Sequence, residues 1–348
     1  ATPNERGMMA SSGRLPRRLL FVVRSSGGGS LINVLLLVRS LDRERFLTTV
    51  LFYGPNAYVE EFEKAGAEVR ILDHQPSSGN PPRATGQPPH ERRHRLPDLT
   101  LLQPARQLSG LVRRDWPRAR QIARVIQETE ANLVQCNICP SADRATILAA
   151  LLAGVPQVCY AQSFTSTDAW IDRQLALRVD RYLCISEAVR RQLRQEAGVP
   201  KSRMSVVHAP FEFPFETFHH GNRDIRAGLG ANGRHVLIAN VGRIIPWKGQ
   251  DVFLRAFAQI AHRFPEARAV IVGSAGDKPQ GRAFEKELHR LAMELRIEGR
   301  VVFAGHRDDV EVVMGASDIV VHSSSKPEPL GRVIMEAIAL GRPVIATN

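Results

Sequence analysis

Residues 235–263 read HVLIANV, GRIIPWKG and QDVFLRAFAQIAHR in succession, and this stretch decides the expected fold. The first seven residues are mostly apolar, as in a strand that is covered on both faces of a parallel sheet. A turn with a glycine at each end, Gly242–Gly249, follows, and a helix is expected from Gln250 to Arg263. Strand, turn and helix in this order form the repeating unit of a doubly wound α/β domain.

The same alternation continues from this stretch to the end of the sequence. Four more strands are expected at 269–272, 301–303, 319–322 and 343–347, with helices between them at 281–295, 308–315 and 331–340. Strands that alternate with helices predict one parallel sheet. Because only Asn348 follows the last strand, we expect this domain, residues 235–348, to be incomplete at its C-terminal end.

The N-terminal half repeats the pattern. Strands are expected at 19–23, 48–53, 68–72, 132–136, 157–160, 181–185 and 204–208, and helices at 31–41, 59–65, 117–130, 142–153 and 187–196, the last with Ser186 as its N-cap. The predicted fold class is therefore α/β, with two doubly wound, Rossmann-like parallel-sheet domains. The first spans residues 18–212. Residues 1–17 are expected to be a disordered tail, and residues 213–234, which lack periodicity, a linker.

Composition limits the class of protein. The 348 residues carry a formal net charge of +12, with 43% hydrophobic and 24% charged residues, which is ordinary for a globular protein. No apolar run approaches the ~18 residues of a membrane span, and Leu19–Val23 is too short for a signal-peptide core. A cytoplasmic location is therefore the default expectation. A basic balance suits phosphate ligands, anionic membrane surfaces or nucleic acid, or reflects a compositional bias toward arginine.

Residues 74–98 interrupt the alternation. They are rich in proline and glycine, and we expect a flexible basic insertion. Three interpretations remain open: a lid over an acceptor site, a peripheral contact with the anionic inner face of a membrane, and a solvated insertion. No aromatic residues interleave the charges as they do in nucleic-acid platforms, so no nucleic-acid partner is expected. The arginines of the insertion 74–98 are Arg83, Arg92, Arg93 and Arg95.

The cysteines do not predict a metal site. Cys136 and Cys139 have the C-x-x-C spacing, but no second pair and no nearby histidine completes a zinc site. A redox pair would usually lie at a helix N-terminus, whereas Cys136 ends an expected strand. We therefore expect structural thiols and no bound metal.

Two carboxylates flank a turn near the end of the sequence. Residues 323–337 read SSSKPEPLGRVIMEA, with Glu328 before the expected helix and Glu336 about a turn and a half inside it. The unpaired amides at a helix N-terminus favour an anion, and Gly331 lets the backbone approach it. This pattern suits a nucleotide sugar, although the spacing alone is weak, because Glu60 and Glu68 are also eight apart.

The turn 242–249 adds two cations to this picture. Arg243 and Lys248 both lie at the carboxyl end of a strand, which is where α/β sheets bind ligands. Arginine offers phosphate a planar fork and lysine a compact charge. The two side chains together could hold a diphosphate.

These motifs, in this order, resemble the donor domain of retaining glycosyltransferase family 4, which has the two-domain B-type glycosyltransferase fold. The resemblance is carried by residues 241–249, 305–309, 316–318, 328–336 and 341–344. A looser resemblance to the acceptor domain rests on residues 28–29, 154–156 and 179–187. The family fold implies that the two domains face a cleft.

The resemblance also implies roles for individual residues. Arg243 and Lys248 would bind the diphosphate and, with Glu328 on the sugar hydroxyls, act in catalysis. The donor site would further use Gly242, Leu330 and Gly331 near the phosphates, Glu336 at the ribose, and His306 and Arg307 near the base. Gly28 and Gly29 would border the reaction centre. No cofactor or metal is expected, and the partners implied are a UDP- or GDP-type sugar and an acceptor glycan or lipid-linked glycan.

This sequence departs from the family pattern on the acceptor side. Leu31 stands where a Glu is common, Gln162 and the region of Gln135 and Asn137 lack frequent histidines, and residues 208–210 replace an Asn-Gly. The alternative function is therefore a nucleotide-sugar-binding protein with little or no transferase activity.

Overall fold

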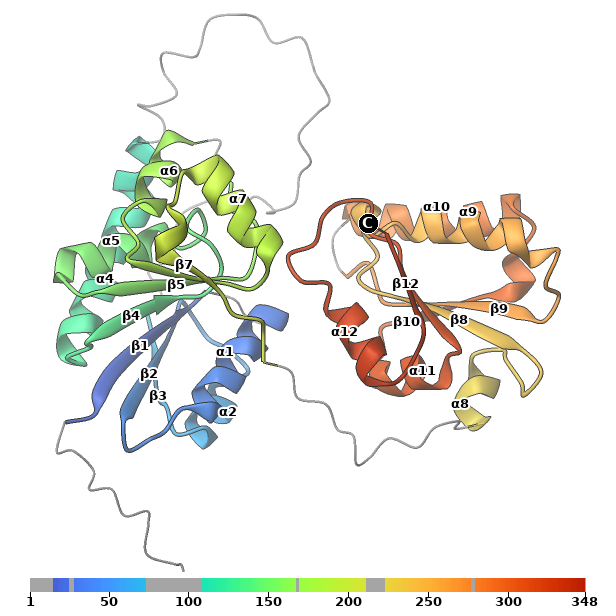
Figure 1. Ribbon diagram of the computed structural model, residues 1–348, viewed down its shortest axis with the longest axis horizontal. Coiled ribbons are helices and arrows are strands. Elements are labelled where there is room, and N and C mark those ends of the chain that lie inside the picture. Colours follow the sequence, from blue (N-terminus) through green and yellow to red (C-terminus); the bar gives the residue numbers. More distant parts are fainter. Residues whose placement is uncertain are drawn as a thin grey trace, which may run out of the picture. The chain divides into compact units, whose positions relative to one another are not determined.

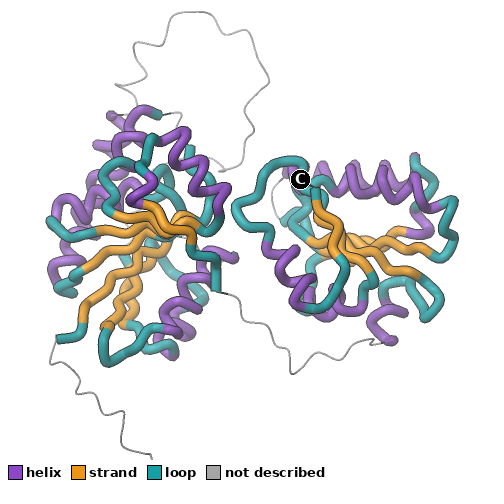
Figure 2. Tube along the Cα trace, in the orientation of Figure 1, coloured by secondary structure: helices purple, strands orange, loops and turns teal. Residues whose placement is uncertain are grey.

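The protein consists of two α/β units. The computed structural model describes residues 15–24, 28–72, 108–166, 169–210, 223–276 and 279–347. The chain divides into two compact units, Ala1–Phe211 and Glu212–Asn348. Each unit is a parallel sheet with helices on both faces (Figures 1 and 2). The predicted fold class of two doubly wound parallel-sheet domains is therefore confirmed.

The first unit has a seven-stranded parallel sheet. Its strand order is β3-β2-β1-β4-β5-β6-β7, so the chain builds one side of the sheet first and then crosses to the other. The strands are β1 (Arg17–Val23), β2 (Phe46–Phe52), β3 (Glu68–Ile71), β4 (Leu133–Cys136), β5 (Gln157–Ala161), β6 (Arg181–Cys184) and β7 (Met204–Val206). The helices are α1 (Gly29–Ser40), α2 (Val59–Lys64), α4 (Trp116–Glu128), α5 (Arg144–Ala153), α6 (Trp170–Ala176) and α7 (Glu187–Ala197).

Strand β1 shows why the sheet is covered on both faces. Leu20 and Val22 pack into a buried cluster with α4 and α5. Phe21 and Val23, which point to the opposite face, pack with α1 and α2. Because side chains alternate along a strand, a continuous apolar run buries both faces, and the run at 19–23 was the sequence signal for this arrangement.

The second unit has a five-stranded parallel sheet in the order β10-β9-β8-β11-β12. Its strands are β8 (Val236–Val241), β9 (Ala267–Val272), β10 (Val301–Gly305), β11 (Ile319–His322) and β12 (Val344–Ala346). Its helices are α8 (Arg223–Gly228), α9 (Gln250–Ala261), α10 (Pro279–Glu294), α11 (Val310–Ala316) and α12 (Arg332–Ala339). Ile238 of β8 packs with α9 and α10, whereas Leu237 and Ala239 pack on the other face with Val313 of α11.

Two parts of the structure differ from the expectation. Helix α6 was not predicted, and part of the predicted linker 213–234 belongs to the second unit. Arg226 of α8 forms an ion pair of 3.2 Å with Asp318 and donates a hydrogen bond of 2.6 Å to the carbonyl of Ala316. Leu229 and Ala231 are buried in the adjoining core. A six-residue helix held by one arginine leaves no apolar periodicity in the sequence, which is why the pattern indicated a linker.

Some predictions fall on residues that the structure does not describe. The predicted insertion 74–98 lies outside the described residues, as does the predicted tail up to residue 14. Arg17, which the sequence assigned to the tail, is the first residue of β1. Within the described ranges, no helix combines the length and apolarity needed to cross a bilayer.

Both sheets reverse their strand order at one point. The reversal lies between β1 and β4 in the first unit and between β8 and β11 in the second, and in both pairs the strands are parallel. Open α/β sheets bind ligands outside the carboxyl ends of the strands at such a point. The segments that follow Val23, Val241 and His322 are therefore the expected locations of a ligand site.

Candidate active site

The turn after β8 and the loop after β11 lie against each other. The backbone N–H of Ser325 donates to the carbonyl of Trp247 at 2.8 Å, and the hydroxyl of Ser323 donates to the carbonyl of Lys248 at 3.0 Å. The amide of Asn240, at the end of β8, donates to the Ser323 hydroxyl at 2.9 Å. These hydrogen bonds fix the segment that begins at Ser323 on the turn 242–249.

Gly249 makes this close contact feasible. Its φ is +69°, in the left-handed region, and a Cβ on it would lie 2.0 Å from the carbonyl oxygen of Ser323. A side chain would therefore clash with backbone as well as strain the turn. The glycine that ends the turn in the sequence thus allows the two loops to touch.

Lys248, Glu328, His322 and Ser324 form a cluster at this contact. Nζ of Lys248 lies 2.6 Å from Oε1 of Glu328, and Nε2 of His322 lies 2.7 Å from the same oxygen. The hydroxyl of Ser324 also donates to Oε1 of Glu328. Oε2 of Glu328 accepts a hydrogen bond from no described residue. One carboxylate oxygen is therefore held by three groups, and the other is left for a ligand.

The cluster is mostly buried and keeps Glu328 ionised. The side chains of Lys248, Glu328 and His322 are 14%, 12% and 8% exposed. Burial alone would raise the pKa of Glu328, but hydrogen bonds from His322, Lys248 and Ser324 outweigh it and lower the pKa to about 2. The carboxylate is therefore anionic at neutral pH and can only accept hydrogen bonds.

Lys248 retains donors beyond its bond to Glu328. An ammonium group has three N–H donors, and its charge also lies 4.8 Å from the ring centre of Trp247. Arg243, at the start of the same turn, is exposed, and within the described ranges its guanidinium has no hydrogen bond or ion pair. Its backbone carbonyl accepts from the side chain of Gln250 at 3.0 Å. The turn therefore combines one mostly buried, paired cation, Lys248, and one exposed cation, Arg243, that no described residue pairs with.

Helix α12 begins at the expected turn. Gly331 is its N-cap, with a φ of +69°, and Glu336 is the fifth residue of Arg332–Ala339. No described group accepts a hydrogen bond from the backbone N–H of Leu330 or Gly331, so these amides are available to a ligand. Nε of Arg332 lies 3.3 Å from Oε1 of Glu336, whose side chain is 20% exposed.

The segment predicted to lie near the base is paired with its own neighbours. Arg307 donates two hydrogen bonds to Asp309, at 2.8 and 2.6 Å, and these lower the pKa of Asp309. Nε2 of His306 lies 3.4 Å from Asp308, with both side chains exposed. The structure records no contact between these residues and the Lys248 cluster, and their role at the base stays a prediction.

In the first unit, the predicted glycines lie at the start of α1. Gly28 is the N-cap of α1, with a φ of +87°, and Gly29 is the first residue of the helix. Gly242, the corresponding glycine of the second unit, directly follows β8 and has a φ of +156°. Among the described residues, no contact shows a role for Gly28, Gly29 or Gly242 in ligand binding.

A buried amide network lies at the strand-order reversal of the first sheet. Asn33 donates to Oε1 of Gln162 at 2.7 Å, and Nε2 of Gln162 donates to the carbonyl of Asn137 at 2.9 Å. Nε2 of Gln135 donates to Oδ1 of Asn137 at 2.7 Å. Three of these residues lie where the sequence departs from the family pattern. These departures therefore belong to one connected network, in which none of the side chains is ionisable.

Asp143 completes this edge of the first sheet. Its Oδ2 accepts hydrogen bonds from the backbone N–H groups of Ile138 and Cys139, at 3.0 and 3.3 Å. Burial raises the pKa of this carboxyl group to about 6. Cys136 and Cys139 are buried free thiols, and burial raises the pKa of Cys139. Among the described residues, no group of three or more His, Cys, Asp or Glu side chains could hold a metal ion.

Two members of the cluster were not predicted from the sequence. His322 was predicted only to end a strand and Ser324 only to belong to the loop that follows, yet both contact Glu328. Their signal was positional, because a polar residue that ends a buried strand next to β8 must lie at the ligand-binding edge.

Family comparisons cover most of the chain. Residues 57–212 match the model of Glycosyltransferase Family 4, and residues 221–348 match that of Glycosyl transferases group 1. D-inositol 3-phosphate glycosyltransferase from Mycobacterium sp. (strain KMS) is 36% identical over 178 residues, which are 50% of this chain and 38% of that protein. The protein of the same name from Rhodococcus opacus (strain B4) is 34% identical over 180 residues, 51% and 40% of the two chains. The chain thus matches about two-fifths of the length of these curated relatives.

Solved structures show the same two-unit architecture. The Anabaena protein HepE in complex with UDP and glucose is 26% identical, with a TM-score of 0.69 over 94% of this chain and 80% of that chain. The structure of its complex with UDP-glucose gives 25% identity and a TM-score of 0.70, again over 94% of this chain and 80% of that chain. A glycosyltransferase from Rickettsia africae has a TM-score of 0.72 at 18% identity, over 96% and 79% of the two chains, and this likeness concerns the fold alone. With both of its units matched by family models and its whole architecture by these structures, the chain belongs to the family 4 glycosyltransferases of the B-type fold.

Proposed function

We propose that this protein transfers a sugar from a UDP-sugar to an acceptor hydroxyl with retention of anomeric configuration. The observation that carries the proposal is the mostly buried pair of Lys248 and Glu328 at the strand-order reversal of the second unit. The proposal is supported by the Anabaena relative, whose structures hold UDP and UDP-glucose. The sequence alone left UDP and GDP open, and these complexes favour UDP.

The diphosphate of the donor would bind the turn 242–249. Lys248 offers the N–H donors that Glu328 does not use, and Arg243 offers an unpaired planar fork. The free amides of Leu330 and Gly331, at the N-terminus of α12, add donors of the same polarity. These groups would offset the charge that develops on the leaving diphosphate, and we propose that no metal ion is required.

Glu328 would hold the transferred sugar. Its Oε1 is fixed by three donors, and its Oε2 is free to accept from a sugar hydroxyl. Because the carboxylate is already ionised and oriented, little reorganisation accompanies the reaction. We propose that Glu336 accepts hydrogen bonds from the ribose in exchange for its weak pair with Arg332.

Retention would follow from a leaving phosphate that takes the acceptor proton on the same face of the sugar. This route needs no enzyme nucleophile, and positioning and electrostatics then supply most of the rate. The acceptor is a separate proposal. The sequence suggested a glycan or lipid-linked glycan, and the curated relatives are named for an inositol phosphate acceptor, so both classes should be tested.

One observation favours the alternative of donor binding without transfer. The side chain of Gln162 stands where the family pattern often has histidine. Its Oε1 accepts from Asn33, and its Nε2 donates to the carbonyls of Asn137 and Ser30. The side-chain amide of Gln162 is therefore not ionisable, and it has no free N–H group to donate to an acceptor hydroxyl.

The deciding experiment combines binding and turnover. Calorimetric titration of the full chain with UDP, GDP and UDP-glucose should show UDP binding that Arg243→Gln and Glu336→Ala weaken. NMR of the product should then show the donor's anomeric configuration, with turnover that survives EDTA. Unchanged UDP affinity in both variants would overturn the site. Binding without transfer or donor hydrolysis, with both acceptor classes present, would favour the alternative.

A further inference from the structure

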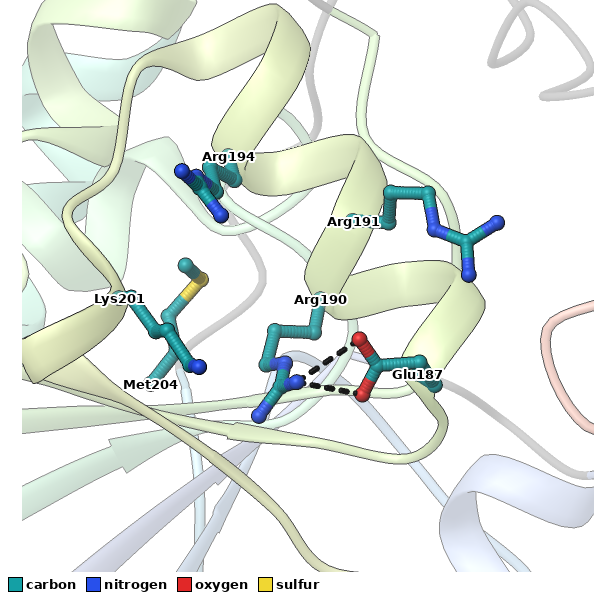
Figure 3. A pocket seen from close by; sticks show the side chains of 6 residues that line it. All are labelled: Glu187, Arg190, Arg191, Arg194, Lys201 and Met204. Carbon is teal, nitrogen blue, oxygen red and sulfur yellow. Dashed lines mark hydrogen bonds and ion pairs between the residues drawn. The ribbon is translucent and has the colours of Figure 1, made fainter.

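The first unit contains a basic pocket whose lining shares no residue with the candidate active site. It has a volume of about 280 Å³ and lies between α7, the short turn Lys201–Arg203 and the start of β7 (Figure 3). Strand β7 is the edge strand of the seven-stranded sheet, three positions from β4 at the strand-order reversal. The pocket is lined by Glu187, Arg190, Arg191, Arg194, Lys201 and Met204.

The charges in this pocket are not balanced. Four cationic side chains and one carboxylate give the lining a formal charge of +3. The carboxylate of Glu187 is paired within the pocket, because Nη2 of Arg190 lies 2.8 Å from both of its oxygens. Among the described residues, no carboxylate pairs with Arg191, Arg194 or Lys201. Within the described ranges, the three other cations of the lining are therefore unpaired, and two of them, Arg194 and Lys201, lie on the same side of α7 (Figure 3).

The side-chain directions concentrate these two cations. Arg190 and Arg194 are four residues apart and so share a face of α7, and Lys201 approaches the same face from the following turn (Figure 3). Arg191 extends from the other side of the helix (Figure 3). Because Arg194 and Lys201 carry like charges on the same face, an anion between them would be stabilising. Buried Met204 supplies an apolar floor.

We propose that this pocket binds a phosphate monoester. Such a group carries about −1.5 to −2 charges near neutral pH, which matches the two unpaired cations Arg194 and Lys201. The guanidinium fork of Arg194 and the ammonium of Lys201 can each donate to different phosphate oxygens, while the Glu187–Arg190 pair closes one side. The phosphate could belong to a soluble ester or to a lipid headgroup, since both present the same charge and oxygens. The site does not depend on the proposed transfer reaction.

The test compares two variants of the first unit in the full chain. Arg194→Gln/Lys201→Gln removes two unpaired cations from the pocket, and Arg124→Gln removes an exposed charge from α4, outside the pocket lining. Inorganic phosphate is titrated by calorimetry at constant ionic strength. In a second arm, vesicles of phosphatidylcholine with and without phosphatidic acid are tested by flotation. Circular dichroism checks that each variant is folded.

We expect the double variant to weaken phosphate binding at least about tenfold, because each charge-assisted hydrogen bond contributes on the order of a factor of ten. Arg124→Gln should change it by less than about twofold. Binding of phosphatidic acid vesicles with this variant pattern, without binding of free phosphate, would support the site and identify a headgroup as its ligand. Equal losses in both variants, or no binding in either arm, would overturn the proposal.

Discussion

Lys248 and Glu328 are 80 residues apart in the sequence, yet Nζ of the lysine lies 2.6 Å from Oε1 of the glutamate. They meet because β8 and β11 are parallel neighbours, so the segments after both strands leave the same edge of the sheet. The contact places a mostly buried cation–anion pair at the strand-order reversal of the second unit. The candidate chemistry of the protein therefore follows from the topology of one sheet.

The stability of the second unit should depend on the charge of Glu328. The pKa of this group is lowered from its usual 4.5 to about 2 in the folded protein, so its contribution is fully present above about pH 4.5 and is lost as the pH falls toward about 2. Glu328→Gln should lower the free energy of unfolding by about 3 kcal/mol at neutral pH, because it also leaves Lys248 buried without a counter-charge. Urea denaturation at several pH values measures this difference.

The matched control is Glu336→Gln. This carboxylate has one pair at 3.3 Å, so its loss should cost less than about 1 kcal/mol. The loss of unfolding free energy in Glu328→Gln should decrease between about pH 5 and about pH 2.5. A loss that stays constant would show that the charge of Glu328 is not the cause of the stabilisation.

His322 should act by positioning Glu328. Its Nε2 lies 2.7 Å from Oε1, so His322→Ala should raise the pKa of Glu328 toward its usual value. We expect turnover to fall by about tenfold or more with UDP affinity nearly unchanged, and the acid limb of the pH–rate profile to move to higher pH. Ser324→Ala, which removes a neutral donor to the same oxygen, should move the limb in the same direction. A lower rate with an unmoved acid limb would indicate a merely structural role.

The sequence predicted the strands better than the contacts between distant segments. Apolar runs such as 236–241 are determined locally by burial on both faces, and the predicted strand at 319–322 coincides with β11. Helix α8 was missed because one long-range pair, Arg226 with Asp318, holds it. His322 was missed for the same reason, since its role arises only when β11 lies beside β8. Its neighbour Glu328 was found because a turn and a helix start mark it locally.

Gly249 should be intolerant of any side chain. Alanine there would adopt a left-handed conformation and bring Cβ within 2.0 Å of the carbonyl oxygen of Ser323. Gly341→Ala is the matched control, because its φ is +65° but no atom lies within 4 Å of the added carbon. The control should cost about 1–2 kcal/mol from backbone strain alone. Gly249→Ala should cost at least about 3 kcal/mol and abolish UDP binding, as the segment that begins at Ser323 must move. Equal losses of stability in Gly249→Ala and Gly341→Ala would show that the close approach of Gly249 to Ser323 does not restrict residue 249 to glycine.

Asp143 should make the first unit less stable as the pH rises. Burial raises its pKa from 3.8 to about 6 in the folded protein, so its neutral form is favoured there. The stabilising contribution is therefore present below about pH 3.8 and is lost as the pH rises through about 6.

Asp143→Asn removes the ionisation and keeps an oxygen that can accept from the N–H groups of Ile138 and Cys139. The stability of the variant relative to the wild type should rise by about 3 kcal/mol between about pH 4 and about pH 8. Urea denaturation at both pH values measures this, with Asp180→Asn as control, because exposed Asp180 also accepts a backbone N–H, from Gln157 at 2.9 Å. An equal pH trend in both variants would mean that burial of Asp143 is not its cause.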